Sequence, residues 1–348
     1  MRELNDIIEN ELISNLVSIF KRSPKQLNKL QETDAEIIQL NESTSIAVTT
    51  DSIAEEISVG LYDDPYLIGW MIVTVSISDL AAVGATPVGI LISEIIPKKF
   101  GSEKVEQLQK GISDACNCYQ TFVLGGDTNE GDNLVVTGTA IGILKNGKFL
   151  SRVGCKPDDI LYSTGELGIG NTFAISKLIK KSDEKIVYKP IAQLKNLDLI
   201  IKYASSCMDT SDGFIATIDQ LMRLNNVGFE ICRDWHKSID QNALKYVEGL
   251  NIPSWLLFAG QHGEFELVFS IPNELNNSFL NEAFDSNFYP IELGTVITKP
   301  QVLLPLYSQL VPINTKFLRN LPAVSDGDIN HYFEQLLRYD FKLKNNLH

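Results

Sequence analysis

Hydrophobic and polar positions follow two different periods along the chain, which separate the expected strands from the expected helices. Short apolar runs bounded by polar or turn-forming residues predict strands. These runs lie at 45–51, 121–124, 134–144, 160–164, 229–232 and 266–271. A helical period predicts helices at 102–119, with Ser102 as the N-cap, and at 214–224. Strands alternate with helices in both halves, which predicts an α/β or α+β fold.

The same pattern divides the chain into three expected parts. Residues 1–30 mix apolar and charged positions at helical spacing and predict a helical N-terminal arm. The pair Asn146-Gly147 predicts a hairpin turn, and the polar turn at 155–159 marks a boundary before a new strand. We therefore expect an N-terminal domain over 31–153 and a C-terminal α/β domain over 154–348.

The most apolar region, residues 69–96, raises the question of a membrane span. It contains Asp79, Pro87 and Glu94, so we expect a buried core segment instead. The β-branched content over 71–77, taken alone, favours a strand. The first residues are polar and acidic, so we expect no signal peptide and a cytoplasmic protein.

Composition and charge narrow the classes of function. Of the 348 residues, 44% are hydrophobic and 21% are charged, which excludes disordered and low-complexity chains. The formal net charge of −14 argues against nucleic-acid binding through a basic face. The same charge repels free phosphates, so a phosphate ligand requires a metal ion between itself and the protein. Five cysteines without zinc-site spacing are expected to be reduced, as in the cytosol.

Six aspartates stand beside apolar runs or at the ends of predicted elements, where an unpaired carboxylate is costly. They are Asp34, Asp51, Asp79, Asp127, Asp209 and Asp212. Some have an ordinary structural alternative: Asp212 as a helix N-cap, Asp127 as a turn residue and Asp51 as a strand end. Asp79 has no such role inside its apolar stretch. Together these carboxylates suit Mg²⁺, which takes oxygen ligands and bridges to phosphates.

Common nucleotide-binding signatures are missing from the sequence. There is no G-x-x-x-x-G-K-[ST] loop and no protein-kinase H-R-D or D-F-G pattern. The segment G-E-L-G-I-G at 165–170 lacks the glycine spacing of a dinucleotide-binding loop. Two interpretations of it stay open, a tight strand-to-helix turn and a phosphate cradle.

Six motifs occur in an order that resembles a known family. They are T-T-D-S-I-A-E at 49–55, S-D-L-A-A-V-G-A-T-P at 78–87, G-G-D-T at 125–128, S-R-V-G-C-K-P-D-D at 151–159, T-G-E-L-G at 164–168 and D-T-S-D-G at 209–213. Over residues 30–272 the chain resembles the thiamine-monophosphate kinase family. That family belongs to the superfamily of aminoimidazole ribonucleotide synthetase, selenophosphate synthetase and the hydrogenase maturation dehydratase.

The resemblance implies an aminoimidazole ribonucleotide synthetase-like fold with two α/β domains. The N-terminal domain would complete a sheet or barrel with its copy across a homodimer. The resemblance also implies a buried helix over 67–83 and then a strand over 88–95, in place of the strand favoured at 71–77. We adopt the helix, because tertiary burial overrides local propensity.

The resemblance further implies a Mg²⁺-dependent phosphotransferase that converts ATP and thiamine phosphate to ADP and thiamine diphosphate. Its metal ligands would be Asp34, Thr49, Thr50, Asp51, Asp79, Asp127, Asp209 and Asp212. Its nucleotide contacts would be Gly125, Gly126, Asp127, Arg152 and Ser211. Asp51, Asp127 and Arg152 would be catalytic, and no protein nucleophile is required because metals and charge position the phosphates.

Positions that would contact the acceptor depart from the family pattern. Ser58 stands where the family has a histidine after the T-T-D motif. The family segment G-G-E-D-Y-E-L appears as Q-H-G-E-F-E-L at 261–267, and G-D-D-A-A appears as E-T-D-A-E at 32–36. We take Ser58, His262 and Glu264 as candidate acceptor contacts.

Three hypotheses about function stay open. The first is the kinase, with thiamine monophosphate as the leading acceptor. The second is a related enzyme that uses ATP to activate a carbonyl or amide oxygen, which Ser58 and the altered segment 261–266 favour. The third is a non-catalytic nucleotide-binding relative, and the six retained acids argue against it because their mutual repulsion is unfavourable without bound cations. The expected partners are a small phosphorylated substrate and a second copy of the chain, without nucleic acid or membrane.

Overall fold

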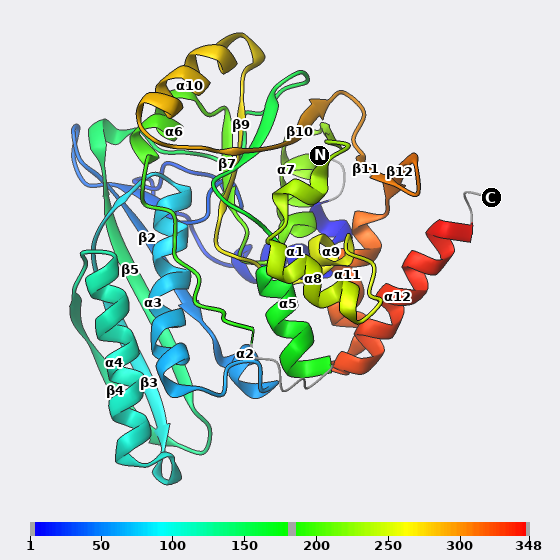
Figure 1. Ribbon diagram of the computed structural model, residues 1–348. Coiled ribbons are helices and arrows are strands. Elements are labelled where there is room, and N and C mark those ends of the chain that lie inside the picture. The colour runs from blue at the N-terminus through cyan, green and yellow to red at the C-terminus, as the bar shows by residue number, and fades with distance from the viewer. Residues whose placement is uncertain (1–3, 180–185, 346–348) are drawn as a thin grey trace. The chain divides into compact units, whose positions relative to one another are not determined.

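The computed structural model describes residues 4–179 and 186–345 and contains two compact units (Figure 1). Unit 1 consists of Met1–Arg22, Ser151–Ile186 and Lys202–His348, and unit 2 consists of Ser23–Leu150 and Val187–Ile201. The chain therefore enters unit 2 twice, whereas the domains expected from the sequence are contiguous. The chain passes back into unit 1 for the second time within helix α6 (Leu197–Tyr203).

Unit 2 is built on a five-stranded sheet with the order β1-β2-β5-β3-β4. The strands are β1 (Glu36–Gln39), β2 (Ser45–Ser52), β3 (Thr86–Pro97), β4 (Val123–Gly131) and β5 (Val135–Leu144). Neighbouring strands are antiparallel except β3 and β4, which run parallel. The strands predicted at 45–51 and 134–144 are confirmed as β2 and β5. Their side chains alternate between a covered and a more open face of the sheet, as the sequence pattern predicts.

Helix α3 (Pro65–Ala82) covers one face of this sheet, and α4 (Ser102–Cys118) packs against α3 (Figure 1). The side chain of Asp64 caps α3 by accepting the N–H of Tyr66 at 3.0 Å. Two glycines bring the helix backbones together. A Cβ on Gly69 would lie 2.0 Å from the carbonyl oxygen of Leu108, and one on Gly111 would lie 2.1 Å from that of Tyr66.

Among the described residues, α3 alone is long and apolar enough to cross a membrane, and 78% of it is buried inside the protein. The expectation of a buried core segment is therefore confirmed, and so is the helix implied at 67–83. The strand favoured by β-branched content at 71–77 is wrong. Nearly every side chain of α3 is covered by the sheet or by α4, so burial outweighs the modest helix propensity of its valines and isoleucines.

Strand β4 extends well beyond the strand predicted at 121–124, and it excludes the alternative of Asp127 as a turn residue. The strand begins at Val123 and continues through the G-G-D-T motif to Gly131. It persists because β3 pairs with it from Ile90 to Pro97, so the backbone groups of the motif take part in a ladder. The motif is therefore part of an edge strand.

Two further local predictions in unit 2 are wrong. Gly101, with φ of 84°, is the N-cap of α4, and Ser102 is the first helical residue without a capping side-chain bond. Residues Lys145–Gly147 form one turn of 3₁₀ helix, and no strand follows at 149–150 in the described chain. The expected Asn-Gly hairpin is absent, because both edges of β5 already pair with β2 and β3 up to its end and leave no free edge for a following strand.

Unit 1 contains a seven-stranded mixed sheet with the order β12-β11-β8-β10-β6-β9-β7. The strands are β6 (Ile160–Ser163), β7 (Ser206–Asp209), β8 (Gly228–Ile231), β9 (Leu267–Ile271), β10 (Ile291–Ile297), β11 (Val302–Leu306) and β12 (Gln309–Ile313). Only the pair of β8 and β11 is parallel among these described strands. The strands predicted at 160–164, 229–232 and 266–271 are confirmed within a residue or two.

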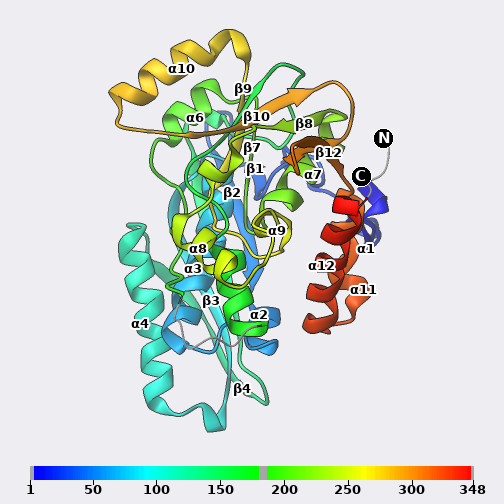
Figure 2. The ribbon, with the colours of Figure 1, turned by 45° about the vertical axis from the view of Figure 1, so that its right-hand side comes forward.

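The helices of unit 1 are α1 (Ile8–Val17), α5 (Ile169–Ala174), α7 (Phe214–Asn225), α8 (Gln241–Gly249), α9 (Leu256–Ala259), α10 (Asn273–Asp285), α11 (Thr315–Ser325) and α12 (Ile329–Asn345). Helices α7, α8, α9, α11 and α12 contribute buried apolar side chains to one core, whereas Leu12 and Leu16 of α1 are exposed. The aromatic residues of this core are Phe214, Phe229, Trp235, Tyr246, Trp255, Phe258 and Phe333. Figure 2 shows α11 and α12 side by side, with α1 next to α11. The helix predicted at 214–224 is α7.

Helix α1 is held to unit 1 by polar contacts. The buried amide of Asn10 donates to the side-chain oxygen of Gln220 on α7 at 3.0 Å. The side chain of Asn320 on α11 accepts the N–H of Ile8 and donates to the carbonyl of Asp6, both at 2.9 Å. The N-terminal helix is thus an integral part of unit 1.

Candidate metal and nucleotide site

Unit 2 brings together three of the predicted metal ligands beside α3. Thr49 and Asp51 are alternate residues of β2 that face this helix. A Cβ on Gly138, which pairs with Asp51, would lie 2.8 Å from the hydroxyl of Ser76 on α3. Asp79 projects from the last turns of α3, and its Oδ2 accepts a hydrogen bond from Thr49 Oγ1 at 2.5 Å.

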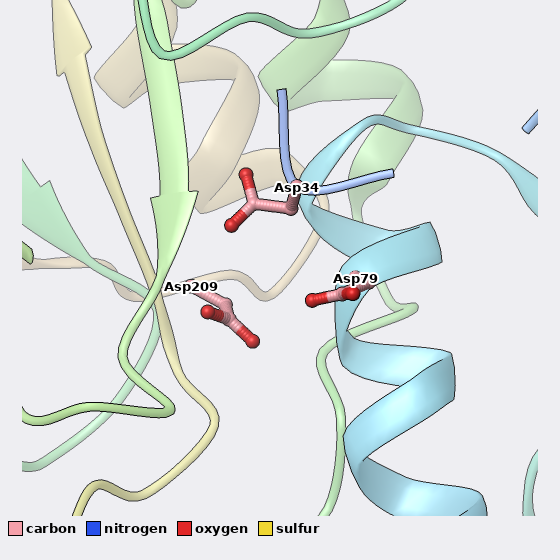
Figure 3. A group of neighbouring side chains, drawn as sticks. All are labelled: Asp34, Asp79 and Asp209. Carbon is pink, nitrogen blue, oxygen red and sulfur yellow. The ribbon is translucent and has the colours of Figure 1, made fainter. Parts of the chain in front are cut away.

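Asp34 lies in the turn before β1, close to Asp79. One carboxylate oxygen of each lies within 4.8 Å of the other. Figure 3 draws Asp34 on the segment before β1 and Asp79 on α3, together with Asp209 of unit 1. Two ligands on opposite sides of one Mg²⁺ are about 4.2 Å apart. The spacing between Asp34 and Asp79 therefore suits a shared cation after a small adjustment.

The electrostatics of Asp51 support a cation at this place. Burial raises its pKa to about 6, and the negative charge of Asp34 acts in the same direction. Hydrogen bonds from Ser76 and Thr49 oppose the shift without cancelling it. A divalent cation between these oxygens would stabilise the ionised form. All the donors are carboxylate or hydroxyl oxygens, which Mg²⁺ prefers, so the residues present fit the ion.

Thr50, another predicted ligand, points to the opposite face of the sheet. Its hydroxyl bonds to the carbonyl oxygen of Gly138 at 3.2 Å and to the hydroxyl of Thr139 at 3.0 Å. A pocket of about 610 Å³ lies here, lined by residues that include Asp34, Glu36 and Thr50. Its volume falls in the range of roughly 300–1,000 Å³ that is typical of small-molecule sites. Asp34 and Thr49 are among the residues that line both this pocket and the oxygen group beside α3.

The G-G-D-T motif lies apart from this group within unit 2. Gly126 and Asp51 lie in the same row across the sheet, and Asp127 lies in the next row, where it pairs with Ser93. Because the side chains of successive rows point to opposite faces of a sheet, the side chain of Asp127 points away from α3. It is exposed on the edge strand, where its Oδ2 accepts the side-chain N–H of Asn129 at 2.6 Å. Gly125 precedes it on β4. A Cβ on Gly126 would lie 1.8 Å from the backbone of β3, so only glycine fits.

The D-T-S-D-G motif forms a turn of unit 1 between β7 and α7. Asp209 ends β7, is 1% exposed, and accepts the hydroxyl of Ser211 at 2.9 Å on Oδ1. Asp212 is exposed and stands before Gly213, the N-cap of α7. Gly213 has φ of 82°, a conformation that favours glycine. The turn thus presents Asp209, Ser211 and Asp212 from one rigid corner.

A charged neighbourhood of unit 1 surrounds Asp212 and includes two residues that the sequence did not single out. Arg319 on α11 donates to Glu9 of α1 and to the carbonyl of Ala216, each at 3.1 Å. Burial raises the pKa of Glu9, the charge of Asp212 raises it further, and Arg319 and Arg152 lower it. The charges of Arg152 and Asp212 therefore both act on Glu9. No local sequence signal marks Glu9 or Arg319.

The three candidate acceptor contacts are divided between the two units. Ser58 is exposed at the end of α2 (Ala54–Ser58) in unit 2, and its hydroxyl donates to the carbonyl of Glu55 at 2.8 Å. His262 and Glu264 are buried in unit 1, and burial lowers the pKa of His262 to about 4 and raises that of Glu264 to about 8. The backbone N–H groups of Gly168 and Gly170 donate to Glu264 at 2.7 and 3.1 Å. The segment 165–170 therefore forms a tight turn whose amides hold the chain's own carboxylate.

Comparison with known proteins places these features in a family. Residues 32–144 match the family described as AIR synthase related protein, N-terminal domain. The chain is 29% identical to thiamine-monophosphate kinase of Methanocaldococcus jannaschii over 283 residues, which cover 75% of this chain and 86% of that protein. It is 27% identical to the corresponding kinase of Nitrosopumilus maritimus over 311 residues, covering 87% and 96% of the two chains.

Solved structures with the same fold include thiamine monophosphate kinase from Aquifex aeolicus, at a TM-score of 0.66 and 24% identity over 86% of this chain and 97% of that one. A structure described as AaThiL complexed with AMPPCP and TMP has a TM-score of 0.71 and 23% identity over 90% and 98%. A HypE–HypF complex has a TM-score of 0.69 at 17% identity over 87% and 98%. The mixed α/β fold is thereby confirmed. In its motifs, its match to the AIR synthase related domain and its curated relatives, the chain is similar to thiamine-monophosphate kinases.

Proposed function

We propose that this chain transfers the γ-phosphoryl group of ATP to the phosphate of thiamine monophosphate, giving ADP and thiamine diphosphate. Its curated relatives carry the name of that enzyme. The observation that carries the proposal is the oxygen group of unit 2, in which Thr49 bonds Asp79 and Asp34 lies within 4.8 Å of Asp79. An acidic chain needs such a group before it binds a polyphosphate through cations.

The proposed transfer requires no covalent intermediate on the protein. A phosphate oxygen of the acceptor attacks Pγ, the bond from Pγ to the bridging oxygen breaks, and ADP leaves with that electron pair. Mg²⁺, when bound, would neutralise charge on the phosphates and hold them in line. Asp34, Thr49, Asp51 and Asp79 would hold it from unit 2. The turn bearing Asp209 would supply further ligands from unit 1.

The remaining assignments belong to the same proposal. Asp212 would supply a further oxygen ligand to the metal ions, whereas the side chains of Thr50 and Asp127 point away from the oxygen group beside α3 and would not join it. Gly125, Gly126 and Ser211 would contact ATP. Arg152 would place its positive charge against the transferring phosphoryl group, which strengthens binding of the transition state. Ser58 would lie toward the acceptor.

We also propose a homodimer formed through the edge of the unit 2 sheet. Phe122, Leu124, Leu91 and Ile95 are exposed there, on β3 and on β4 or just before it, and Phe122 is 69% exposed. A second copy would remove this apolar surface from water and cover an edge strand that otherwise exposes its backbone groups. We place the protein in the cytoplasm, where its five free cysteines would stay reduced.

The test is identification of the product by chromatography with Mg²⁺, ATP and thiamine monophosphate. Asp79→Asn removes one ligand charge at constant shape and should lower kcat at least about 100-fold. Asp132→Asn, which changes an exposed carboxylate of the same unit, should leave the rate unchanged. Thiamine diphosphate formed at equal rates by both variants would contradict the proposal. Release of ADP without thiamine diphosphate would favour carbonyl activation instead.

A further inference from the structure

The segment 261–266 departs from the family pattern, and it makes a set of hydrogen bonds and backbone contacts inside unit 1. It runs directly against the turn that carries Asp209, Ser211 and Asp212. The N–H of Gly263 donates to the carbonyl oxygen of Ser211 at 3.0 Å. A second contact to the same turn follows three residues later.

Glu266 makes that second contact through its backbone. Its N–H donates to the hydroxyl of Thr210 at 3.1 Å, and its carbonyl oxygen accepts the N–H of Thr210 at 2.9 Å. The side chain of Glu266 is itself fixed, because the hydroxyl of Thr164 donates to it at 2.5 Å. Gly263 and Glu266 of the segment are therefore both hydrogen-bonded to the turn at 209–213.

Between these contacts the two backbones touch without any side chain between them. A Cβ on Gly263 would lie 1.4 Å from the carbonyl oxygen of Thr210 and 3.0 Å from the nitrogen of Gly213. Phe265 has φ of 62°, a conformation that costs a non-glycine residue roughly 1 kcal/mol or more. The backbone therefore bends directly after Glu264, and the hydrogen bonds of the neighbouring residues hold this conformation.

Glu264 anchors the segment from the other side. It is 4% exposed, and its Oε1 accepts both the N–H of Gly168 and the N–H of Gly170. The backbone there is also in contact, because a Cβ on Gly170 would lie 2.2 Å from the carbonyl oxygen of Gly263. One carboxylate thus ties the glycine turn, the segment and, through Gly263, the D-T-S-D-G turn into one stack.

We propose that Glu264 is a positioning residue for the nucleotide site, which fixes the turn bearing Asp209, Ser211 and Asp212 through Gly263, and is not an acceptor contact. This inference rests on the proposed function of that turn in holding Mg²⁺ and ATP. It reassigns the altered family segment from recognition of the acceptor to preorganisation of the metal ligands. Preorganised ligands bind without first being ordered, so loosening them weakens nucleotide binding.

The experiment measures binding of a non-hydrolysable ATP analogue with Mg²⁺ by calorimetry, and KM for both substrates. Glu264→Ala removes the anchor and should weaken analogue binding about 10-fold or more, with KM for thiamine monophosphate unchanged. Glu264→Gln keeps an oxygen that accepts both glycine amides and should bind within about two-fold of the wild type. If the alanine variant fails to fold, Glu264→Asp, whose shorter side chain cannot reach both amides, should show the same loss.

The matched control is Asp340→Ala, which removes another buried carboxylate of unit 1. Asp340 accepts hydrogen bonds from Trp255 and Tyr307 and has no contact with the turn. It should lower the melting temperature without changing analogue affinity. Equal affinity changes in both variants, or none in either, would overturn the proposal. A raised KM for thiamine monophosphate alone would contradict the proposal and support Glu264 as an acceptor contact. Wild-type protein that binds the analogue but makes no thiamine diphosphate would refute the proposed function and leave this inference standing.

Discussion

Replacing Glu264 by glutamine should make the stability of unit 1 less sensitive to pH. Burial raises the pKa of this carboxyl from 4.5 to about 8 in the folded protein, although the amides of Gly170 and Gly168 oppose the shift. Below about pH 4.5 the group is protonated in both states and has no effect. Between pH 4.5 and 8 the folded chain keeps a proton that the unfolded chain has lost, so stability falls as the pH rises.

The size of the effect follows from the width of that interval. Each pH unit lowers the free energy of unfolding by up to about 1.4 kcal/mol, which gives an upper bound of about 5 kcal/mol across the interval. Glu264→Gln cannot titrate. Its free energy of unfolding should match that of the wild type near pH 5 and exceed it by a few kcal/mol at pH 8.

Urea unfolding from pH 5 to 8.5 tests this prediction. The buried tryptophans Trp235 and Trp255 report on unit 1 through their fluorescence. Glu274→Gln, which removes a surface charge from the same unit, is the control. A difference between Glu264→Gln and the wild type that stays constant over the whole pH range would refute the reasoning.

Three other predictions concern packing and assembly. Asp219 and Arg223 form a buried ion pair at 2.7 Å, so Asp219→Leu should cost about 3–5 kcal/mol in urea unfolding, and adding Arg223→Met should recover most of it. Equal losses in the single and double variants would contradict this. Gly69→Ala should destabilise unit 2 by several kcal/mol because its Cβ would meet the α4 backbone, whereas Gly249→Ala meets nothing and should be neutral or stabilising in calorimetry. Phe122→Asp should convert a dimer to a monomer in sedimentation at micromolar concentration, and a wild type that is already monomeric would refute the proposed interface.

Elements with a clean period were predictable from the sequence. The apolar positions of α4 recur every three to four residues and face α3, and those of β5 alternate between two faces. In α3, by contrast, periodicity carries no information because nearly every position is apolar. Only the resemblance to a family predicted a helix there. The segment is helical because it is buried on all sides, which outweighs its local propensity.

The candidate site was predictable in part. Asp79 stood out because a carboxylate inside an apolar run needs a partner, and the structure places Thr49 beside it. The edge-strand position of Asp127 was not predictable, since it depends on β3 offering a long parallel partner. The roles of Glu264 and Glu9 depend on contacts with residues about a hundred or more positions away, Gly168 and Arg319, which leave no local pattern.

The central claim is that the oxygen group of unit 2 holds the cations that bind nucleotide. Mn²⁺ binding, measured by electron paramagnetic resonance in the presence of a non-hydrolysable ATP analogue, tests it most directly. Mn²⁺ takes the same oxygen ligands as Mg²⁺ and reports on its own coordination. Wild-type protein and Asp132→Asn should bind tightly held Mn²⁺, and Asp79→Asn should lose at least one such ion. Identical Mn²⁺ binding by Asp79→Asn and the wild type would contradict the account.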